Sequence, residues 1–165
     1  MRNRTSLASD GGTAPVEYKI VALRECAAST ARVVEPIQAA NYWQHNIASA
    51  PNFNKEVESL AVLMLNTRGH AKGHQIVSLG TVDSCILHPR EIFRAAIISS
   101  AHGIVVMHNH PSGDPSPSQE DIRQTLNLVN AGKLLQIQII DHVIVGSARA
   151  TGLQPYSSLR ELGYF

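Results

Sequence analysis

Residues 104–111 read Ile104-Val105-Val106-Met107-His108-Asn109-His110-Pro111, and they constrain the fold more than any other part of the chain. The first four are apolar without alternation, which predicts a strand buried on both faces. The two histidines are two residues apart, so in extended backbone both imidazoles point to the same side. We therefore expect a pair of histidines with the spacing of a metal clamp at the end of a buried strand.

The segment after the histidines predicts a loop and then a helix. Residues 111–117, Pro-Ser-Gly-Asp-Pro-Ser-Pro, indicate a stiff, turn-rich loop, and Ser118 opens a helix. Asp121 falls in the first turn of this helix, from where its carboxylate can turn back toward the histidines. Two neutral imidazoles and one carboxylate, with a fourth position left for water, suit a catalytic zinc ion. Ser118-x-x-Asp121 also matches a capping box, in which the two side chains satisfy free amides at the helix start.

These residues together resemble a known family. His108-Asn109-His110-Pro111, followed by Ser118-x-x-Asp121, is similar to the JAMM (MPN-type) metalloprotease motif in the variant of bacterial RadC-like proteins. The resemblance extends to residues 77–81, 88–93 and 141–146 and covers about residues 56–165. It implies an MPN (JAB) domain, a curved mixed β-sheet sandwiched by helices, similar to cytidine deaminases. Strands interleaved with helices independently predict an α/β fold.

The resemblance also implies a glutamate upstream of the histidines that acts as general base. Glu56 and Glu58 both precede the apolar run 60–65, and periodicity does not separate them because residues two apart share a face. The RadC-like pattern Glu-x-Φ-x-Val-Leu-x-Leu-Asn, where Φ is apolar, aligns with residues 58–66 and favours Glu58. Glu91 is a third candidate, but its position at a predicted helix start favours a capping or dipole role.

The predicted function is a zinc-dependent hydrolase of peptide or isopeptide bonds. Zinc held by His108, His110 and Asp121 would lower the pKa of its bound water from about 15.7 to about 7. Glu58 would move the proton, and Ser118 would donate a hydrogen bond to the oxyanion of the tetrahedral intermediate. The substrate would be a protein or peptide that the sequence does not identify. Asp141 and His142 are open to two interpretations: an outer shell that orients a metal ligand, or, as we favour, a structural role at a strand start.

Two other functions are alternatives to this hydrolase. The first is a DNA-repair-associated RadC-type accessory or binding module with a non-catalytic metal site. The retained Glu58 favours an enzyme over this module. The second is a zinc deaminase, which is disfavoured because the His-x-Glu and Pro-Cys-x-x-Cys signature is missing.

Composition narrows the class of protein further. The 165 residues carry a net charge of +1, and no basic stripe stands out, so only weak nucleic-acid binding is expected. The helix-hairpin-helix segments of longer RadC-like members are not visible in the sequence. Cys26 and Cys85 suit neither a disulfide framework nor a zinc knuckle. The sequence has neither an apolar run of about 18 residues nor the apolar centre of a signal peptide, so we expect no membrane association and a location in the bacterial cytoplasm.

The chain is expected to have three parts. Residues 1–14 read as a disordered tail, residues 15–55 as an N-terminal strand and helix, and residues 56–165 as the metal-binding domain. Trp43 is expected to be a core anchor of the N-terminal helix. We predict strands over 17–23, 60–65, 75–82, 134–140 and 142–145, and helices from 35 or 36 onward, over 89–100, from 118 to about 130, and over 157–162.

Overall fold

The structure is a computed structural model that describes residues 32–79, 88–147 and 154–165. The helices are α1 (Pro36–Asn46), α2 (Pro89–Ile98) and α3 (Gln119–Leu135). The strands are β1 (Ser59–Leu65), β2 (Ala71–Leu79), β3 (Gly103–Asn109), β4 (Gln138–Val145) and β5 (Tyr156–Ser158). The predicted tail, the predicted strand over 17–23, the last part of the strand over 75–82, and Cys26 and Cys85 lie outside the described residues.

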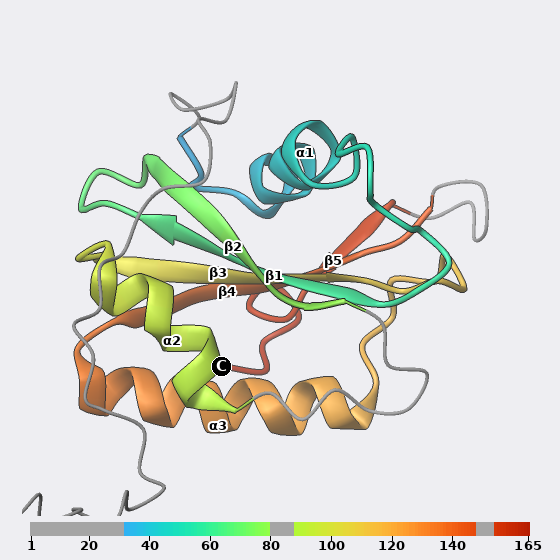
Figure 1. Ribbon diagram of the computed structural model, residues 1–165. Coiled ribbons are helices and arrows are strands. Elements are labelled where there is room, and N and C mark those ends of the chain that lie inside the picture. Colours follow the sequence, from blue (N-terminus) through green and yellow to red (C-terminus); the bar gives the residue numbers. More distant parts are fainter. Residues whose placement is uncertain (1–31, 80–87, 148–153) are drawn as a thin grey trace, which may run out of the picture.

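The strands form one five-stranded sheet within the described residues, in the order β2-β1-β3-β4-β5. β3 and β4 are parallel, and the other neighbouring pairs are antiparallel. A parallel pair needs a crossover connection, and α3 provides it. Figure 1 shows α1 on one face of the sheet and α2 and α3 on the other. The predicted α/β class, a mixed sheet between helices, is confirmed.

Alternation along the central strands separates two apolar layers. Odd-numbered residues of β1 and β3 pack in the layer that contains α1, and even-numbered residues pack in the layer that contains α2. All seven residues of β1 and all seven of β3 are buried, as their apolar runs predict. His108 and His110 continue the even-numbered series, so the sheet directs both imidazoles toward the face that α3 covers.

Trp43 anchors the α1 layer, as predicted. Its side chain is 1% exposed, and its ring meets that of Phe53 edge to face at a centroid distance of 6.0 Å. Pro36 occupies the first turn of α1, where its missing N–H leaves no bond unmade. The predicted N-terminal helix therefore packs directly on the sheet that carries the histidines.

Two predicted boundaries were wrong. α3 continues through Gly132 to Leu135, and one strand, β4, replaces the two that were predicted over 134–145. Gly132 lies inside this helix, and its small size is needed there because a Cβ would lie 2.5 Å from the carbonyl oxygen of Ile137. The predicted helix over 157–162 is also wrong: Tyr156–Ser158 forms β5 and is followed by turns. This segment is a strand because it pairs with β4. Such pairing between separate segments leaves no signal in the local periodicity of the sequence.

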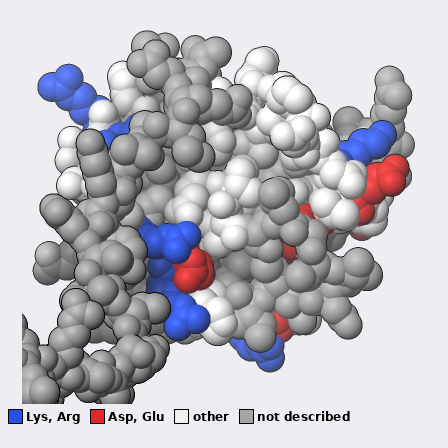
Figure 2. Space-filling model, in the orientation of Figure 1, with Lys and Arg blue, Asp and Glu red and all other residues white. Residues whose placement is uncertain are grey.

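Among the described residues, Figure 2 shows basic side chains gathered over α2 beside an acidic one and no larger basic region on this face. On α2, Glu91 pairs with Arg90 at 3.6 Å and with Arg94 at 3.2 Å. Within the described residues, no helix combines the length and the apolar character needed to cross a membrane.

Candidate metal centre

The end of β3 and the start of α3 bring His108, His110 and Asp121 together. His108 Nε2 lies 3.0 Å from His110 Nε2 and 3.4 Å from Asp121 Oδ1. His110 Nε2 lies 3.6 Å from Asp121 Oδ2. One potential ligand atom from each residue lies within 4.8 Å of the others, and no second group of this kind occurs among the described residues. The predicted ligands therefore form a group that could hold a metal ion.

The loop after β3 orients His110. Its Nδ1 lies 2.8 Å from the backbone oxygen of Asp114. A carbonyl oxygen only accepts hydrogen bonds, so His110 Nδ1 carries a hydrogen. In the neutral ring, Nε2 then presents its lone pair toward the other two residues. Gly146 supports this loop, because a Cβ at that position would collide with the carbonyl oxygen of Gly113 and lie 2.8 Å from Pro115 Cδ.

Ser118 and Asp121 form the capping box that the sequence allowed. Ser118 Oγ accepts from the backbone N–H of Asp121 at 3.1 Å, and Asp121 Oδ2 accepts from the backbone N–H of Ser118 at 2.8 Å. Ser118 Oγ also donates to Asp121 Oδ2 at 2.6 Å. Capping and ligand placement are therefore combined, since the bonds that begin α3 also fix the carboxylate beside the histidines.

Three glutamates were candidates for the general base, and the structure places them in different surroundings. Glu58 Oε1 lies 4.0 Å from His108 Nε2. Glu56 lines an adjoining cleft, and Glu91 is held in ion pairs on α2. Residues 55–57 form a turn and bend before β1 begins. This turn interrupts the two-residue alternation on which the sequence analysis placed Glu56 and Glu58 on the same face.

Asn109 is a residue of the site that the sequence analysis missed. It is buried, and its side chain lies between the backbone groups that flank Glu58: Oδ1 accepts from Ser59 N at 3.0 Å, and Nδ2 donates to the carbonyl of Val57 at 3.1 Å. The sequence held one indication of this role: Asn109 lies between the two histidines, so alternation turns its side chain to the opposite face, where it must find other hydrogen-bond partners.

His142 and Asp141 differ in their relation to the centre. His142 is fully buried on β4, and its Nε2 lies 2.9 Å from His108 Nδ1. Asp141 turns away and accepts a hydrogen bond from Ser158 Oγ at 2.7 Å. The outer-shell geometry therefore occurs at His142, and Asp141 instead joins β4 to the segment after it.

Burial and neighbouring groups shift the pKa values of the three residues at the centre. Burial lowers the pKa of His108 well below its ordinary value, and the neighbouring His142 lowers it further. Burial acts to raise the pKa of Asp121, but the neighbouring rings of His110 and His108 and the hydrogen bonds from Ser118 outweigh it and hold this pKa well below its ordinary value. The Asp121 carboxylate, 3.6 Å from Nε2, raises the pKa of His110. A neutral imidazole and an ionised carboxylate are the forms that bind a metal.

Glu58 and His142 show the effect of burial on groups around the ligands. The pKa of Glu58 is raised, first by burial and then by repulsion from Asp121. Burial lowers the pKa of His142 to about 4, so its ring is neutral at physiological pH.

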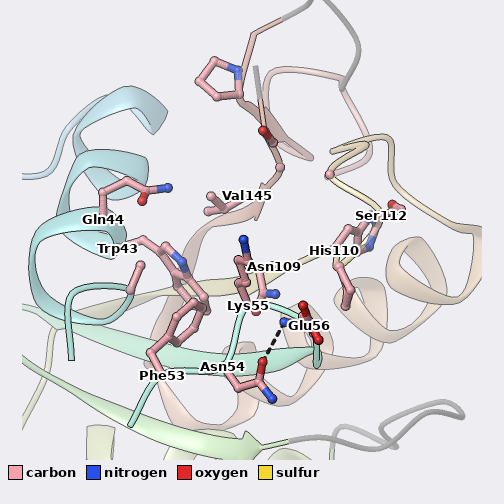
Figure 3. Close-up of a pocket in the computed structure, with 16 residues that line it drawn as sticks. Trp43, Gln44, Phe53, Asn54, Lys55, Glu56, Asn109, His110, Ser112 and Val145 are labelled. Atoms are coloured by element: carbon pink, nitrogen blue, oxygen red, sulfur yellow. Dashed lines mark hydrogen bonds between the residues drawn. The ribbon is translucent and has the colours of Figure 1, made fainter. Parts of the chain in front are cut away.

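A cleft of about 1140 Å³ adjoins the centre and reaches His110. Figure 3 shows Trp43 and Phe53 on the side of this cleft opposite His110 and Ser112, with Glu56 near Asn54 between them. Its volume lies at the upper end of the roughly 300–1,000 Å³ that is usual for small-molecule sites.

The fold and the site define an α/β domain with a candidate metal centre where a buried strand meets the start of a crossover helix. The chain belongs to the RadC-like JAB domain family, whose family model matches residues 33–164. The predicted RadC-like membership is confirmed, and the match begins well before residue 56.

Similar proteins include UPF0758 proteins of bacteria and archaea. That of Staphylococcus haemolyticus is 46% identical over 108 residues, which are 66% of this chain and 45% of the relative. That of Staphylococcus carnosus is 40% identical over 134 residues, 81% of this chain and 54% of the relative. That of Methanococcoides burtonii is 44% identical over 107 residues, 65% and 44% respectively. The chain thus spans about half the length of the curated relatives it matches.

Proposed function

We propose that the protein is a zinc-dependent hydrolase that cleaves peptide or isopeptide bonds. The observation that carries this proposal is the convergence of His108 Nε2, His110 Nε2 and an Asp121 carboxylate oxygen, with the Glu58 carboxylate 4.0 Å from His108 Nε2. A ligand set together with a separate carboxylate at its edge favours a catalytic site over a structural one, which is closed by four protein ligands.

The residues present fit a zinc ion. In a tetrahedral site with bonds of about 2.0–2.1 Å, ligand atoms are about 3.3 Å apart. The three separations in the structure, 3.0, 3.4 and 3.6 Å, lie close to this value. Two imidazoles and one carboxylate also match the donor set of known catalytic zinc sites. When bound, zinc supplies Lewis acidity, which lowers the pKa of water and polarises a carbonyl group.

Glu58 suits the role of general base in the proposed reaction. Its pKa is raised by burial and by Asp121, which brings the carboxylate closer to the pH at which it must accept and return a proton. The expected course is that Glu58 takes a proton from the attacking water and returns it to the leaving amine. Glu56, on the turn before β1, belongs to the cleft and makes the matched control.

Ser118 is proposed to donate a hydrogen bond to the substrate oxygen as negative charge develops there. The hydroxyl has one hydrogen, which is now directed to Asp121 Oδ2. This role therefore requires the hydroxyl to rotate away from Asp121, while its oxygen can still accept from the N–H of Asp121 and keep the helix capped.

The proposed substrate class is a protein or peptide. The cleft of about 1140 Å³ can accommodate a segment of extended chain. Its aromatic, amide and charged side chains can contact a chain of varied sequence. Cleavage beside the metal centre requires the chain to pass His110, which lies at the junction of the cleft and the ligands.

The test is cleavage of a proteome-derived peptide library, supplemented with lysine-branched isopeptides, by the zinc-loaded protein. Mass spectrometry should detect new termini with the wild-type protein and with Glu56→Gln. Glu58→Gln should keep its zinc and its fold but lose about 10²–10⁴-fold in rate. Termini that form equally with Glu58→Gln, or no termini with the wild type, would contradict the proposal.

A further inference from the structure

A buried hydrogen-bonded chain connects α3 to the back of His108. His142 Nε2 lies 2.9 Å from His108 Nδ1, and His142 Nδ1 lies 2.6 Å from Thr125 Oγ1. Thr125 Oγ1 in turn donates to the backbone carbonyl of Asp121, also at 2.6 Å. The side chains of Thr125, His108 and His142 are at most 1% exposed. Water therefore does not compete for these bonds.

The direction of each bond follows from the carbonyl at the end of the chain. A carbonyl oxygen only accepts, so the single hydroxyl hydrogen of Thr125 points to Asp121 O. Toward His142 the Thr125 oxygen must then accept, which places a hydrogen on His142 Nδ1. A neutral imidazole has one N–H, so His142 Nε2 is an acceptor and His108 Nδ1 must donate to it. The lone pair of His108 is consequently on Nε2, the atom that faces His110 and Asp121.

The opposite direction is unfavourable at two points. If Thr125 gave its hydrogen to His142, two oxygen lone pairs would face each other across 2.6 Å at Asp121 O. The reversed chain would also put a hydrogen on His108 Nε2, where it would occupy the position that a metal ligand needs. With a metal bound, only the first direction suits both ends of the chain, because it satisfies Asp121 O and leaves the lone pair of His108 Nε2 to the metal.

We infer that Thr125 and His142 are positioning residues that set the tautomer and ring orientation of His108, so that Nε2 presents a lone pair to the metal. This inference rests on the metal site proposed above. It gives Thr125 a double connection, because its one hydroxyl is bonded to the backbone of Asp121 and, through His142, to His108. Two ligands from different elements are thus coupled through a side chain that touches neither of the ligand atoms.

The inference is tested with Thr125→Val, which keeps the side-chain shape but removes the hydroxyl, and Thr125→Ser, which retains it. Long-range proton–nitrogen NMR spectra of the metal-free chain report which ring nitrogen of His108 and His142 carries hydrogen. Chelator competition then gives zinc affinity. Wild type and Thr125→Ser should show hydrogen on Nδ1 of both rings. Thr125→Val should show mixed tautomers and bind zinc about 10- to 100-fold more weakly.

A control separates this effect from loss of stability. Leu128 is fully buried one turn further along α3 in the apolar layer, so Leu128→Ala should destabilise the fold and leave the tautomers and zinc affinity unchanged. Hydrogen on His108 Nε2 in the metal-free wild type would overturn the inference, even if Thr125→Val failed to fold. So would wild-type tautomers and affinity in a folded Thr125→Val. A failure of peptide cleavage with the expected tautomers would refute the proposed hydrolase alone.

Discussion

Asn109 holds the backbone on both sides of Glu58. Its amide oxygen accepts from the N–H of Ser59 at 3.0 Å, and its amide nitrogen donates to the carbonyl of Val57 at 3.1 Å. The residue between the two histidines therefore sets where the proposed base lies, although its own side chain points away from them. The end of β3 thus carries the two histidine ligands and also holds the backbone around Glu58. The pairing of β3 with β1 fixes the position of Glu58 relative to the histidines.

Replacing Asn109 should loosen Glu58 without removing the metal ligands. Asn109→Ala leaves the Ser59 N–H without its partner, and an unsatisfied buried donor costs about 1–3 kcal/mol. We expect a loss of this size in the free energy of unfolding, measured with urea, and faster hydrogen exchange at the Ser59 amide. Zinc affinity should change only a few-fold. A loss of zinc as large as that in His108→Ala would instead assign Asn109 to ligand placement.

The ligand set predicts which variants lose metal. Elemental analysis of the wild-type chain should give about one zinc per chain, and His108→Ala, His110→Ala and Asp121→Ala should each lose it, because three protein ligands are the usual minimum of a catalytic zinc site. His102→Ala is the matched control, since His102 is exposed on the approach to the same strand. Tightly bound zinc at wild-type levels in all three ligand variants would refute the assignment.

Gly146 predicts a steric route to the same centre. A methyl group at this position collides with the loop at Gly113 and Pro115, and that loop supplies the carbonyl that orients His110. Gly146→Ala should therefore weaken zinc binding, as measured by chelator competition, along with stability. Gly132→Ala is the matched control, because its methyl group meets a backbone oxygen at the far end of α3. Gly132→Ala should lower the free energy of unfolding and leave zinc affinity unchanged. Equal zinc affinity in Gly146→Ala and Gly132→Ala would contradict the prediction.

Local signals in the sequence predicted the parts of the site that depend on alternation and capping. The apolar run before His108 is a buried strand, its alternation places both histidines on one face, and Ser118 caps the helix that carries Asp121. The ligand group could therefore be predicted from residues 104–121 alone. Glu58 required the family pattern, because alternation gives Glu56 and Glu58 the same face and does not predict the turn between them.

Contacts between distant segments were not predictable in the same way. Thr125 lies inside a helix and His142 inside a strand, and only the parallel pairing of β3 with β4 brings His142 to His108. Gly132 was interpreted as a helix end, but its small size serves close packing, and Gln136 takes the left-handed cap with φ 56°. A glycine indicates either role, and the tertiary neighbours that decide between them are absent from a local pattern.

Nucleic-acid binding should be weak. The net charge is +1, and Arg90 and Arg94 are already paired with Glu91. Because phosphate contacts by free cations supply most non-specific affinity, we expect dissociation constants no tighter than about 10⁻⁶ M at physiological salt. Fluorescence anisotropy with duplex and single-stranded DNA over a salt series measures this. A sequence- or structure-specific complex that persists at physiological salt would contradict it and would support a role in DNA repair.

Asp141 predicts a pH dependence of stability that is separate from the metal centre. The residue is 2% exposed, and burial raises its pKa above the ordinary 3.8, despite hydrogen bonds from Ser158 and from backbone amides. A raised pKa means that the folded protein favours the protonated form. The contribution of Asp141 to stability is therefore full below pH 3.8 and is lost as the pH rises through its folded pKa.

Asparagine has no titratable group, so Asp141→Asn should not lose stability at this position as the pH rises. The free energy of unfolding of the variant, minus that of the wild type, should increase from pH 3.8 upward and level off above the folded pKa. Asp114→Asn is a control of opposite sign, because hydrogen bonds from Ser116 lower the pKa of the exposed Asp114, and its difference should fall slightly with pH. Urea titrations at a series of pH values measure both slopes. A falling difference for Asp141→Asn would mean that the three donors around the carboxylate outweigh its burial.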